Sequence, residues 1–342
     1  MQFSRHRDLT ARTGPRTAPP RRIEAPLRAS APAAAAMRVT GHATEPQTSA
    51  CHLAIDWVRI FPKGVGARPD ADSLGALSRQ VDGLLAQGLQ PWATLHQGRL
   101  PPALLEQGGW LKRSTIGAFA DFARLMGEQL GDRVRHWITH DDPGRPSLPG
   151  GAASEAPARA LHTALQISHH RLVSHGEALR ALRSAAPGAQ VGLILSLQAI
   201  RPASHQPADL AAALRLDGLR NRWWLDPLFG CGYPSDVLQA LGVDAPTVLP
   251  GDLRSMASLC DFLAIRPQRH EQQASAAPEP EVDEARILEL LERVHRDYAP
   301  PALYRIRPEA ATPAQAVARS GARLLPGGAE APSFFRIERV SF

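Results

Sequence analysis

The chain has 342 residues, 44% of them hydrophobic, enough to bury one large core or two modest ones. Its formal net charge of +6 is carried by residues 1–40, where eight arginines stand against two acidic residues, so no nucleic-acid partner is expected. The sequence has no run of eighteen apolar residues and no apolar signal region, which argues against a membrane partner and a secretory signal.

The cysteines are odd in number and lack C-x-x-C spacing. Cys51, Cys231 and Cys260 therefore predict neither a disulfide framework nor a zinc site. This usage fits a reducing compartment, so we expect a cytoplasmic protein with no cofactor and no bound metal. A homo-oligomer stays open.

Residues 1–50 are rich in Arg, Pro, Ala, Ser and Thr and show no sustained apolar periodicity. Such a segment buries too little apolar surface to offset its chain entropy, so we predict disorder over 1–50 and a single domain over 51–342. The segment is either a basic, transit-like tail or an over-extended gene start, with Met37 as the second initiator.

From Leu53 onward, short apolar runs alternate with amphipathic stretches, a pattern typical of βα units and a parallel sheet. Strands are predicted at Leu53–Arg59, Gln90–Leu95, His136–Thr139, Gln190–Leu197, Asp261–Ile265 and Ala302–Ile306. Helices are predicted at Ala71–Gln87, Ser114–Leu130, Glu155–Ala186, Pro207–Arg222 and Glu281–Arg296. Glu271–Pro280 is expected to be a loop or linker. The fold class is α/β, with most of a (β/α)₈ TIM barrel.

Several long segments in one order resemble glycoside hydrolase family 1, the β-glucosidase family. They are LAIDWVRIFPKG (53–64), GLQPWATLHQGRLPPALLEQGGW (88–110), GDRVRHWITHDDP (131–143), NRWWLDPLFGCGYP (221–234), PGDL (250–253), DFLAI (261–265) and LERVHRDYAPPALY (291–304). The resemblance implies a (β/α)₈ barrel with its chemistry at the carboxyl ends of the strands. The family's first and eighth strands have no clear counterpart, so the barrel is expected to be incomplete there.

The family's functional positions fall on changed residues. The acid/base position falls on Asp142 and the nucleophile position on Arg307, within LYRIRPEAA (303–311). The remaining positions, which support the nucleophile or bind the sugar, fall on His52, Gln97, Gly98, Asp141, Ser196 and Gln268.

These exchanges argue against hydrolysis. A retaining glycosidase uses two carboxyl groups about 5–5.5 Å apart, one as nucleophile and one as acid. Arg307 cannot be a nucleophile, because its guanidinium stays protonated and offers no lone pair. Asp142 is one methylene shorter than a glutamate, and a misplacement of about 1 Å can cost on the order of 10²-fold in rate. The main prediction is a β-glucosidase-like protein of carbohydrate metabolism that has become a pseudoenzyme, with Asp141, Asp142 and Arg307 forming an ion cluster.

Three alternatives remain. An active β-glycosidase would use relocated carboxylates, with Asp142 as acid and Glu309 as nucleophile. A carbohydrate- or protein-binding scaffold would keep a β-glycoside or sugar ligand without turnover. A metal site would use His52, His96, His140, Asp141 and Asp142, although strand alternation should turn His140 away from its neighbours.

The C-terminal segment lacks the family's W-S-x-x-D-N-x-E-W pattern. Within Arg323–Phe342, the stretch PSFFRIERV is weakly similar to the family's last helix. An open sheet would need its edges covered by this tail, a partner chain or another copy of the chain.

Overall fold

The computed structural model describes residues 50–64, 66, 68–144, 157–268, 280–308 and 335–342. All of them belong to one compact unit, Ala34–Phe342. The segment predicted to be disordered lies outside the described residues except for Ala50, which begins the first strand. The expected linker lies outside them except for Pro280, which begins a helix.

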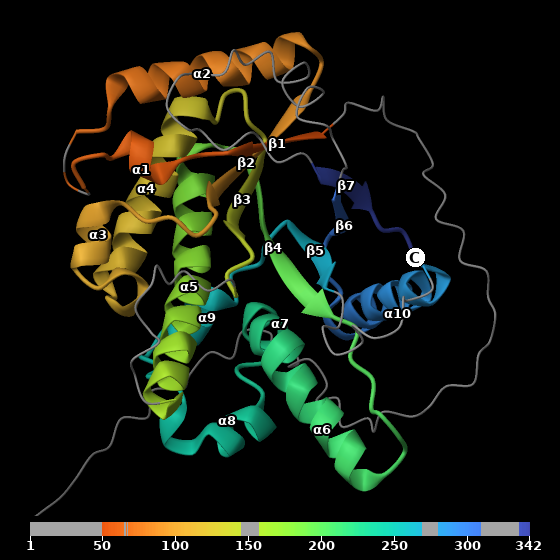
Figure 1. The fold of residues 1–342 in the computed structure, drawn as a ribbon. Helices are drawn as coiled ribbons and strands as arrows, with labels where there is room; N and C mark the ends of the chain where they lie inside the picture. Colours follow the sequence, from red (N-terminus) through yellow and green to blue (C-terminus); the bar gives the residue numbers. More distant parts are fainter. Residues whose placement is uncertain (1–49, 65, 67, 145–156, 269–279, 309–334) are drawn as a thin grey trace, which may run out of the picture. The chain divides into compact units, whose positions relative to one another are not determined.

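A single seven-stranded sheet runs in chain order through the described residues (Figure 1). Its strands are β1 (Ala50–Ala54), β2 (Gln90–His96), β3 (His136–Asp141), β4 (Gln190–Gln198), β5 (Phe262–Gln268), β6 (Leu303–Pro308) and β7 (Phe335–Arg339). Strands β1 to β6 are parallel, and β7 is antiparallel to β6.

Helices connect the parallel strands. The long ones are α2 (Ala71–Ala86), α4 (Ser114–Leu130), α5 (Pro157–Ala185) and α10 (Pro280–Tyr298). The short ones are α1 (Trp57–Ile60), α3 (Pro102–Glu106), η1 (Gly109–Leu111), α6 (Pro207–Asp217), η3 (Gly218–Arg222), α7 (Trp223–Leu228), α8 (Ser235–Leu241), η4 (Gly242–Asp244) and α9 (Asp252–Met256). The predicted helices are confirmed, except that Pro207–Arg222 changes at Gly218 into a short π-helix.

The prediction of a strand over Leu53–Arg59 is wrong beyond Ala54. The Asp56 carboxylate accepts a hydrogen bond of 3.0 Å from the backbone N–H of Val58 and thereby caps α1. An apolar run of this length fits a short buried helix as well as a strand, and the cap selects the helix.

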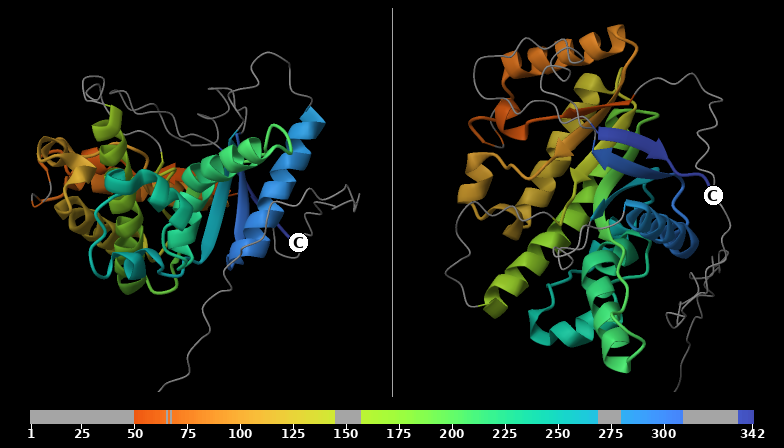
Figure 2. Two further views of the ribbon diagram at one scale, coloured as in Figure 1. Left: turned by 90° about the horizontal axis from the view of Figure 1, so that it is seen from below. Right: turned by 45° about the vertical axis from the view of Figure 1, so that its right-hand side comes forward.

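The outer face of the sheet is covered by helices in two clusters (Figure 2). Residues of α2, α4 and α5 pack on β1 to β3, and residues of α5, α7 and α10 pack on β4 to β6. The inner face has its own apolar layer, with Trp92, Ile138, Ile194, Phe262, Ala264 and Ile306 buried. The sheet is therefore filled from both sides, and only its ends offer positions for polar chemistry.

Strand β7 corrects the expectation of a helix near the C-terminus. In FRIER, Ile337 packs on the inner apolar layer, whereas Glu338 forms an ion pair on the outer side with Arg307. This two-residue alternation is that of a strand. The tail thus covers the edge of β6, one of the three covers expected, and β7 also comes close to β1.

Candidate functional site

A polar layer lies above the inner apolar layer, toward the carboxyl ends of the strands. On β4 and β5, Ile194 and Ala264 belong to the apolar layer, and Ser196 and Arg266 follow two residues later on the same face. Ser196 and Arg266 are direct neighbours in the ladder.

Five side chains of this layer form a hydrogen-bonded row across the sheet. Arg266 donates two bonds to Asp141, of 2.6 and 3.2 Å, in the forked geometry that suits guanidinium and carboxylate. The amide nitrogen of Gln97 lies 3.1 Å from Asp141 Oδ2 and 3.3 Å from His52 Nε2, and His52 Nε2 lies 2.8 Å from Thr94 Oγ1. The structure thus brings together the predicted residues His52, Gln97 and Asp141.

Arg266 was not singled out from the sequence. Arg266 follows the apolar run DFLAI and lies two residues after Ala264, which is buried on the inner face. A charged residue at this spacing was the sequence signal that could have identified Arg266. Its pairing explains how Asp141 is stable although its side chain is only 6% exposed, since a buried carboxylate needs a partner.

Asp142 is held in a fixed position beside this row. Its φ of 58° lies in the left-handed region, which costs a non-glycine residue free energy. Its N–H donates to Ile194 O over 2.9 Å, and Ser196 Oγ donates to its carboxylate over 2.7 Å. The structure therefore pairs two predicted positions, Asp142 and Ser196.

A buried arginine lies behind this turn. Arg171 of α5 donates to Pro143 O over 2.6 Å, and its guanidinium carbon lies 5.9 Å from the Trp110 ring. Burial lowers the pKa of Arg171 to about 10, and the negative charge of Asp142 opposes that change.

Arg307 does not join the aspartates. Tyr304 and Ile306 belong to the inner layer, so Arg307 faces α10 on the outer side. There it donates to Glu284 over 2.9 Å and to Glu338 over 2.8 Å. The predicted ion cluster of Asp141, Asp142 and Arg307 is wrong, because strand alternation turns Arg307 outward.

The remaining predicted positions are peripheral. Gln268, at the exposed end of β5, pairs in register with Gln198 of β4. Glu309 lies outside the described residues. Gly98 adopts a φ of 105°, which only glycine tolerates well, in the turn that follows β2.

His140 points away from Asp141 and the polar layer, as predicted, but it shares a side with Thr139, which strand alternation did not predict. A register irregularity between Ile138 and Asp141 places both Thr139 and His140 toward α5, where they contact His175 and Ser174. The proposed metal ligands are therefore divided between two faces of the sheet. Within the described residues, no three or more His, Cys, Asp and Glu side chains are arranged to hold a metal ion.

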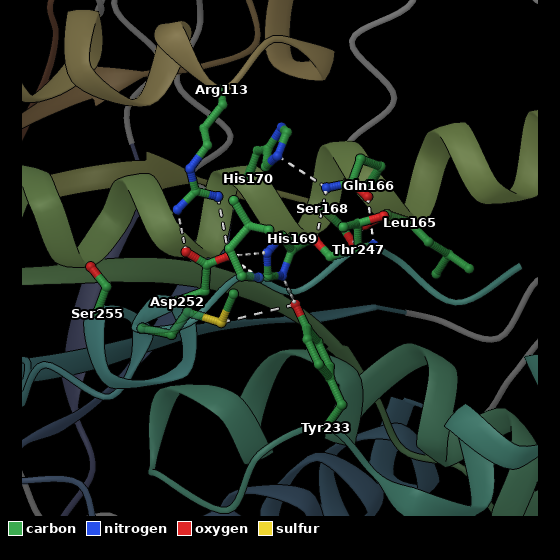
Figure 3. Close-up of polar contacts among 12 residues, drawn as sticks. Arg113, Leu165, Gln166, Ser168, His169, His170, Tyr233, Thr247, Asp252 and Ser255 are labelled. Carbon is green, nitrogen blue, oxygen red and sulfur yellow. Dashed lines mark hydrogen bonds and ion pairs between the residues drawn. The ribbon is translucent and has the colours of Figure 1, made fainter.

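A second polar cluster, not anticipated from the sequence, joins α5 to α9 (Figure 3). Asp252 accepts hydrogen bonds from Arg113, from the Leu249 N–H over 2.8 Å and from His169 Nε2 over 2.9 Å. Since the carboxylate only accepts, His169 carries its proton on Nε2 and its Nδ1 accepts from Tyr233 over 3.0 Å.

The charges in this cluster stabilise the packing of helices and do not form a reactive centre. Burial disfavours the charged carboxylate of Asp252, but the bonds from Arg113, Leu249 and His169 outweigh it, so the pKa of Asp252 falls to about 2. Burial lowers the pKa of His169, which keeps this imidazole neutral. His169 and Asp252 are almost fully buried, so this cluster ties helices together and offers no surface for a substrate.

Beyond these clusters, the helices in the described part of the chain are too short or too polar to cross a membrane. Cys51, Cys231 and Cys260 are free thiols.

Residues 43–300 match the sequence model described as Glycosyl hydrolase family 1. Beta-glucosidase A of Acetivibrio thermocellus is 35% identical over 218 residues, which cover 62% of this chain and 48% of the relative. Thermostable beta-glucosidase B of Thermobispora bispora is 37% identical over 219 residues, covering 64% and 45%. The chain thus spans about half the length of the curated relatives it matches.

Solved structures agree with this similarity. The AHE enzyme from Alicyclobacillus herbarius superposes with a TM-score of 0.67 at 29% identity, covering 78% of this chain and 66% of the other. The family 1 β-glucosidase from Thermotoga maritima gives a TM-score of 0.65 at 25% identity, covering 75% and 61%. The predicted TIM-barrel-like fold, incomplete in its sheet, is thereby confirmed. With a family match over three quarters of its length, the chain belongs to glycosyl hydrolase family 1.

Proposed function

We propose that this chain is a β-glucosidase-like pseudoenzyme, which binds a β-glycoside or sugar at its polar layer and does not hydrolyse it. The observation that carries the proposal is the inner face of β6. Tyr304 and Ile306 occupy its inward positions, and Arg307 is turned outward and bound to Glu284 and Glu338.

This placement removes the attacking group of a retaining mechanism. Two carboxyl groups about 5–5.5 Å apart are needed, and one must reach the anomeric carbon. Glu284 and Glu338 are each bound by Arg307 on the outer side. Among the described residues at the matching positions, Asp142 is the acid, and one of its oxygens already accepts from Ser196. An acid without a nucleophile leaves a retaining enzyme without its first step.

The same residues support ligand binding. Carboxylate, amide and hydroxyl groups of Asp141, Asp142, Gln97 and Ser196 lie on one end of the sheet, and sugar hydroxyls pair with such groups. One similar structure, the virulence factor SghA, is 30% identical and holds the substrate analogue salicin. Another, a Thermotoga maritima β-glucosidase of 26% identity, holds deoxynojirimycin. We also propose a cytoplasmic location, which the three free thiols support.

Hydrolysis of aryl β-glucosides and β-galactosides by the purified full-length chain tests the catalytic half of the proposal. No turnover above the level of Asp142→Ala is expected. Asp121→Ala, which changes a surface aspartate 69% exposed on α4, is the matched control. Turnover that is lost in both Asp142→Ala and Glu309→Ala, but kept in Asp121→Ala, would establish relocated carboxylates and overturn the proposal.

Titration calorimetry with salicin, deoxynojirimycin and simple mono- and disaccharides tests the binding half. We expect binding by the wild-type chain that weakens by at least about tenfold in Gln97→Ala, because each lost hydrogen bond to a charged or polar ligand is worth about 1.5 kcal/mol. Absence of heat with every sugar, in a sample with native secondary structure, would contradict a retained ligand.

A further inference from the structure

Two buried histidines, His96 and His140, contact each other edge to face behind the polar layer. His96 ends β2 and His140 lies at the irregularity of β3, with 4% and 0% of their surfaces exposed. Their Nδ1 atoms are 3.3 Å apart. Trp110 of η1 donates to His96 Nε2 over 3.3 Å, and His140 Nε2 lies 2.9 Å from Ser174 Oγ. Four side chains from η1, β2, β3 and α5 thus form one hydrogen-bonded chain.

With both rings neutral, the hydrogen-bond partners are compatible with one arrangement of protons. The indole N–H of Trp110 only donates, so His96 Nε2 is an acceptor and His96 carries its proton on Nδ1. That proton points at His140 Nδ1, so His140 must carry its own proton on Nε2 and donate it to Ser174. The Ser174 hydroxyl then donates onward to Arg171 O over 2.8 Å.

An additional proton has no place in this arrangement. On His96 it would have to go to Nε2, where it meets the Trp110 N–H. On His140 it would go to Nδ1, where it meets the Nδ1–H of His96 at 3.3 Å. Either event replaces a hydrogen bond by two donors facing each other, and it leaves a buried cation without an acceptor.

The chain is directly coupled to the candidate site through β3. His140 precedes Asp141 and Asp142, and the irregularity that turns His140 toward α5 also turns Asp141 toward Arg266. We propose that Trp110, His96, His140 and Ser174 form a pH-sensitive latch: it fixes the end of β3, and with it Asp141 and Asp142, while both histidines are neutral, and it opens when either gains a proton.

The surroundings act in the same direction. Burial holds the pKa of His96 and of His140 well below the usual value of 6.5, and the charge of Arg171 lowers both further. His140 also faces His96 and His175. From α4, the group that faces the pair is the uncharged ring of Phe119. Asp142, beyond the turn, compensates Arg171. The charged groups around the latch therefore oppose protonation of its closed form.

The expected size of the response follows from proton linkage. An imidazole released to water has the ordinary pKa of about 6.5. Between pH 7.5 and pH 5, this favours the open state by about 30-fold for one histidine and on the order of 10³-fold for both. The latch regulates the site to which we assign ligand binding, and in that sense it rests on the proposed function. Its tests need neither ligand nor turnover, so the two proposals can fail separately.

The tautomers are tested on the unmodified full chain, labelled with ¹⁵N-histidine. At pH 7.5 the imidazole spectra should show one ring protonated on Nδ1 and a coupled ring protonated on Nε2, assigned by the loss of each signal in His96→Gln and His140→Gln. An imidazolium signal for either ring at this pH, or the same tautomer in both, would overturn the latch.

The release is tested by hydrogen exchange, corrected for intrinsic rates. From pH 7.5 to pH 5, amides of His136–Asp142 should accelerate by at least about 30-fold more than those of β5, our reference strand. His140→Phe keeps an aromatic ring beside Phe119 and Trp110. In this variant, the acceleration of amide exchange in β3 between pH 7.5 and pH 5 should be smaller by a factor of about 30. In Ser174→Ala, the amides of His136–Asp142 should exchange faster than in the wild type already at pH 7.5. Equal pH responses of β3 in the wild type and in His140→Phe would overturn the proposal.

Discussion

His175 on α5 should make the stability of this protein depend on pH. Its ring is fully buried, Nδ1 lies 2.7 Å from Thr139 Oγ1, and Nε2 has no hydrogen-bond partner among the described residues. Burial lowers the pKa of His175 from 6.5 to about 4, and the charge of Arg183 adds to this. Below pH 6.5 the unfolded chain binds a proton that the folded chain refuses, so stability is full above 6.5 and falls as pH drops toward 4.

The magnitude can be worked out for one substitution. A difference of 2.5 pKa units, at 1.36 kcal/mol each, amounts to about 3 kcal/mol between pH 6.5 and pH 4, and to about 2 kcal/mol at pH 5. His175→Leu removes the titrating ring and its unpaired nitrogen, at the cost of one hydrogen bond of about 1 kcal/mol. The free energy of unfolding of the variant should therefore lie within about 1 kcal/mol of the wild-type value at pH 7.5. At pH 5 it should be larger than the wild-type value.

Urea unfolding at pH 7.5, 6 and 5, followed by tryptophan fluorescence, measures this effect. The quantity of interest is the slope of the unfolding free energy against pH, which should be smaller in His175→Leu by up to about 1.4 kcal/mol per pH unit. His205→Gln, at an exposed position, is the matched control and should leave the slope unchanged. Equal slopes in the wild type and in His175→Leu would refute the assignment of a neutral, desolvated imidazole.

Two further substitutions test the packing of α5 and its neighbours by urea unfolding. Asp252→Ala should cost about 3–5 kcal/mol, because it removes a buried carboxylate and leaves His169 without its acceptor. Arg113→Ala should cost less, because Asp252 keeps its bonds from Leu249 and His169. Equal losses would contradict this account. Gly176→Ala would place its Cβ 1.8 Å from a backbone oxygen of α9 and should prevent native packing, but Gly117→Ala on α4 meets nothing within 4 Å and should stabilise by about 0.5–1 kcal/mol. Folding of the Gly176 variant at wild-type stability would show that α5 and α9 are less tightly joined than the structure implies.

Much of the sheet could be predicted because its strands and helices carry a clear periodicity. Ser114–Leu130 has its helical boundaries as predicted, and β4 extends the predicted strand by one residue. Both are long elements with apolar residues on a fixed face, so local pattern and tertiary packing agree. The α1 region failed because the apolar run after Leu53 is short, and a single side chain, Asp56, decided its conformation.

The site was harder to predict, because the direction of a side chain depends on register. Asp141 and Asp142 were identified from their position in the sequence. The irregularity in β3 shifts the alternation by one residue, however, and only the structure shows which face each residue takes. Arg266 escaped notice for a related reason: its role depends on a carboxylate 125 residues earlier in the chain, a pairing that no local pattern encodes.

The two exchanges that seemed independent in the sequence, an arginine at the end of β6 and an altered C-terminal segment, are one structural feature. Arg307 is turned outward, and its guanidinium binds Glu338 of β7, the strand that covers the edge of β6. On the opposite side, Ile337 of the same strand completes the inner apolar layer beside Ile306. Arg307 and Glu338 form the ion pair at the outward positions of β6 and β7. This edge of the sheet is therefore stabilised by ion pairing on one side and by apolar packing on the other. A glutamate at position 307 would face Glu338 and Glu284 and repel both, so a carboxylate at this position would weaken the attachment of the closing strand.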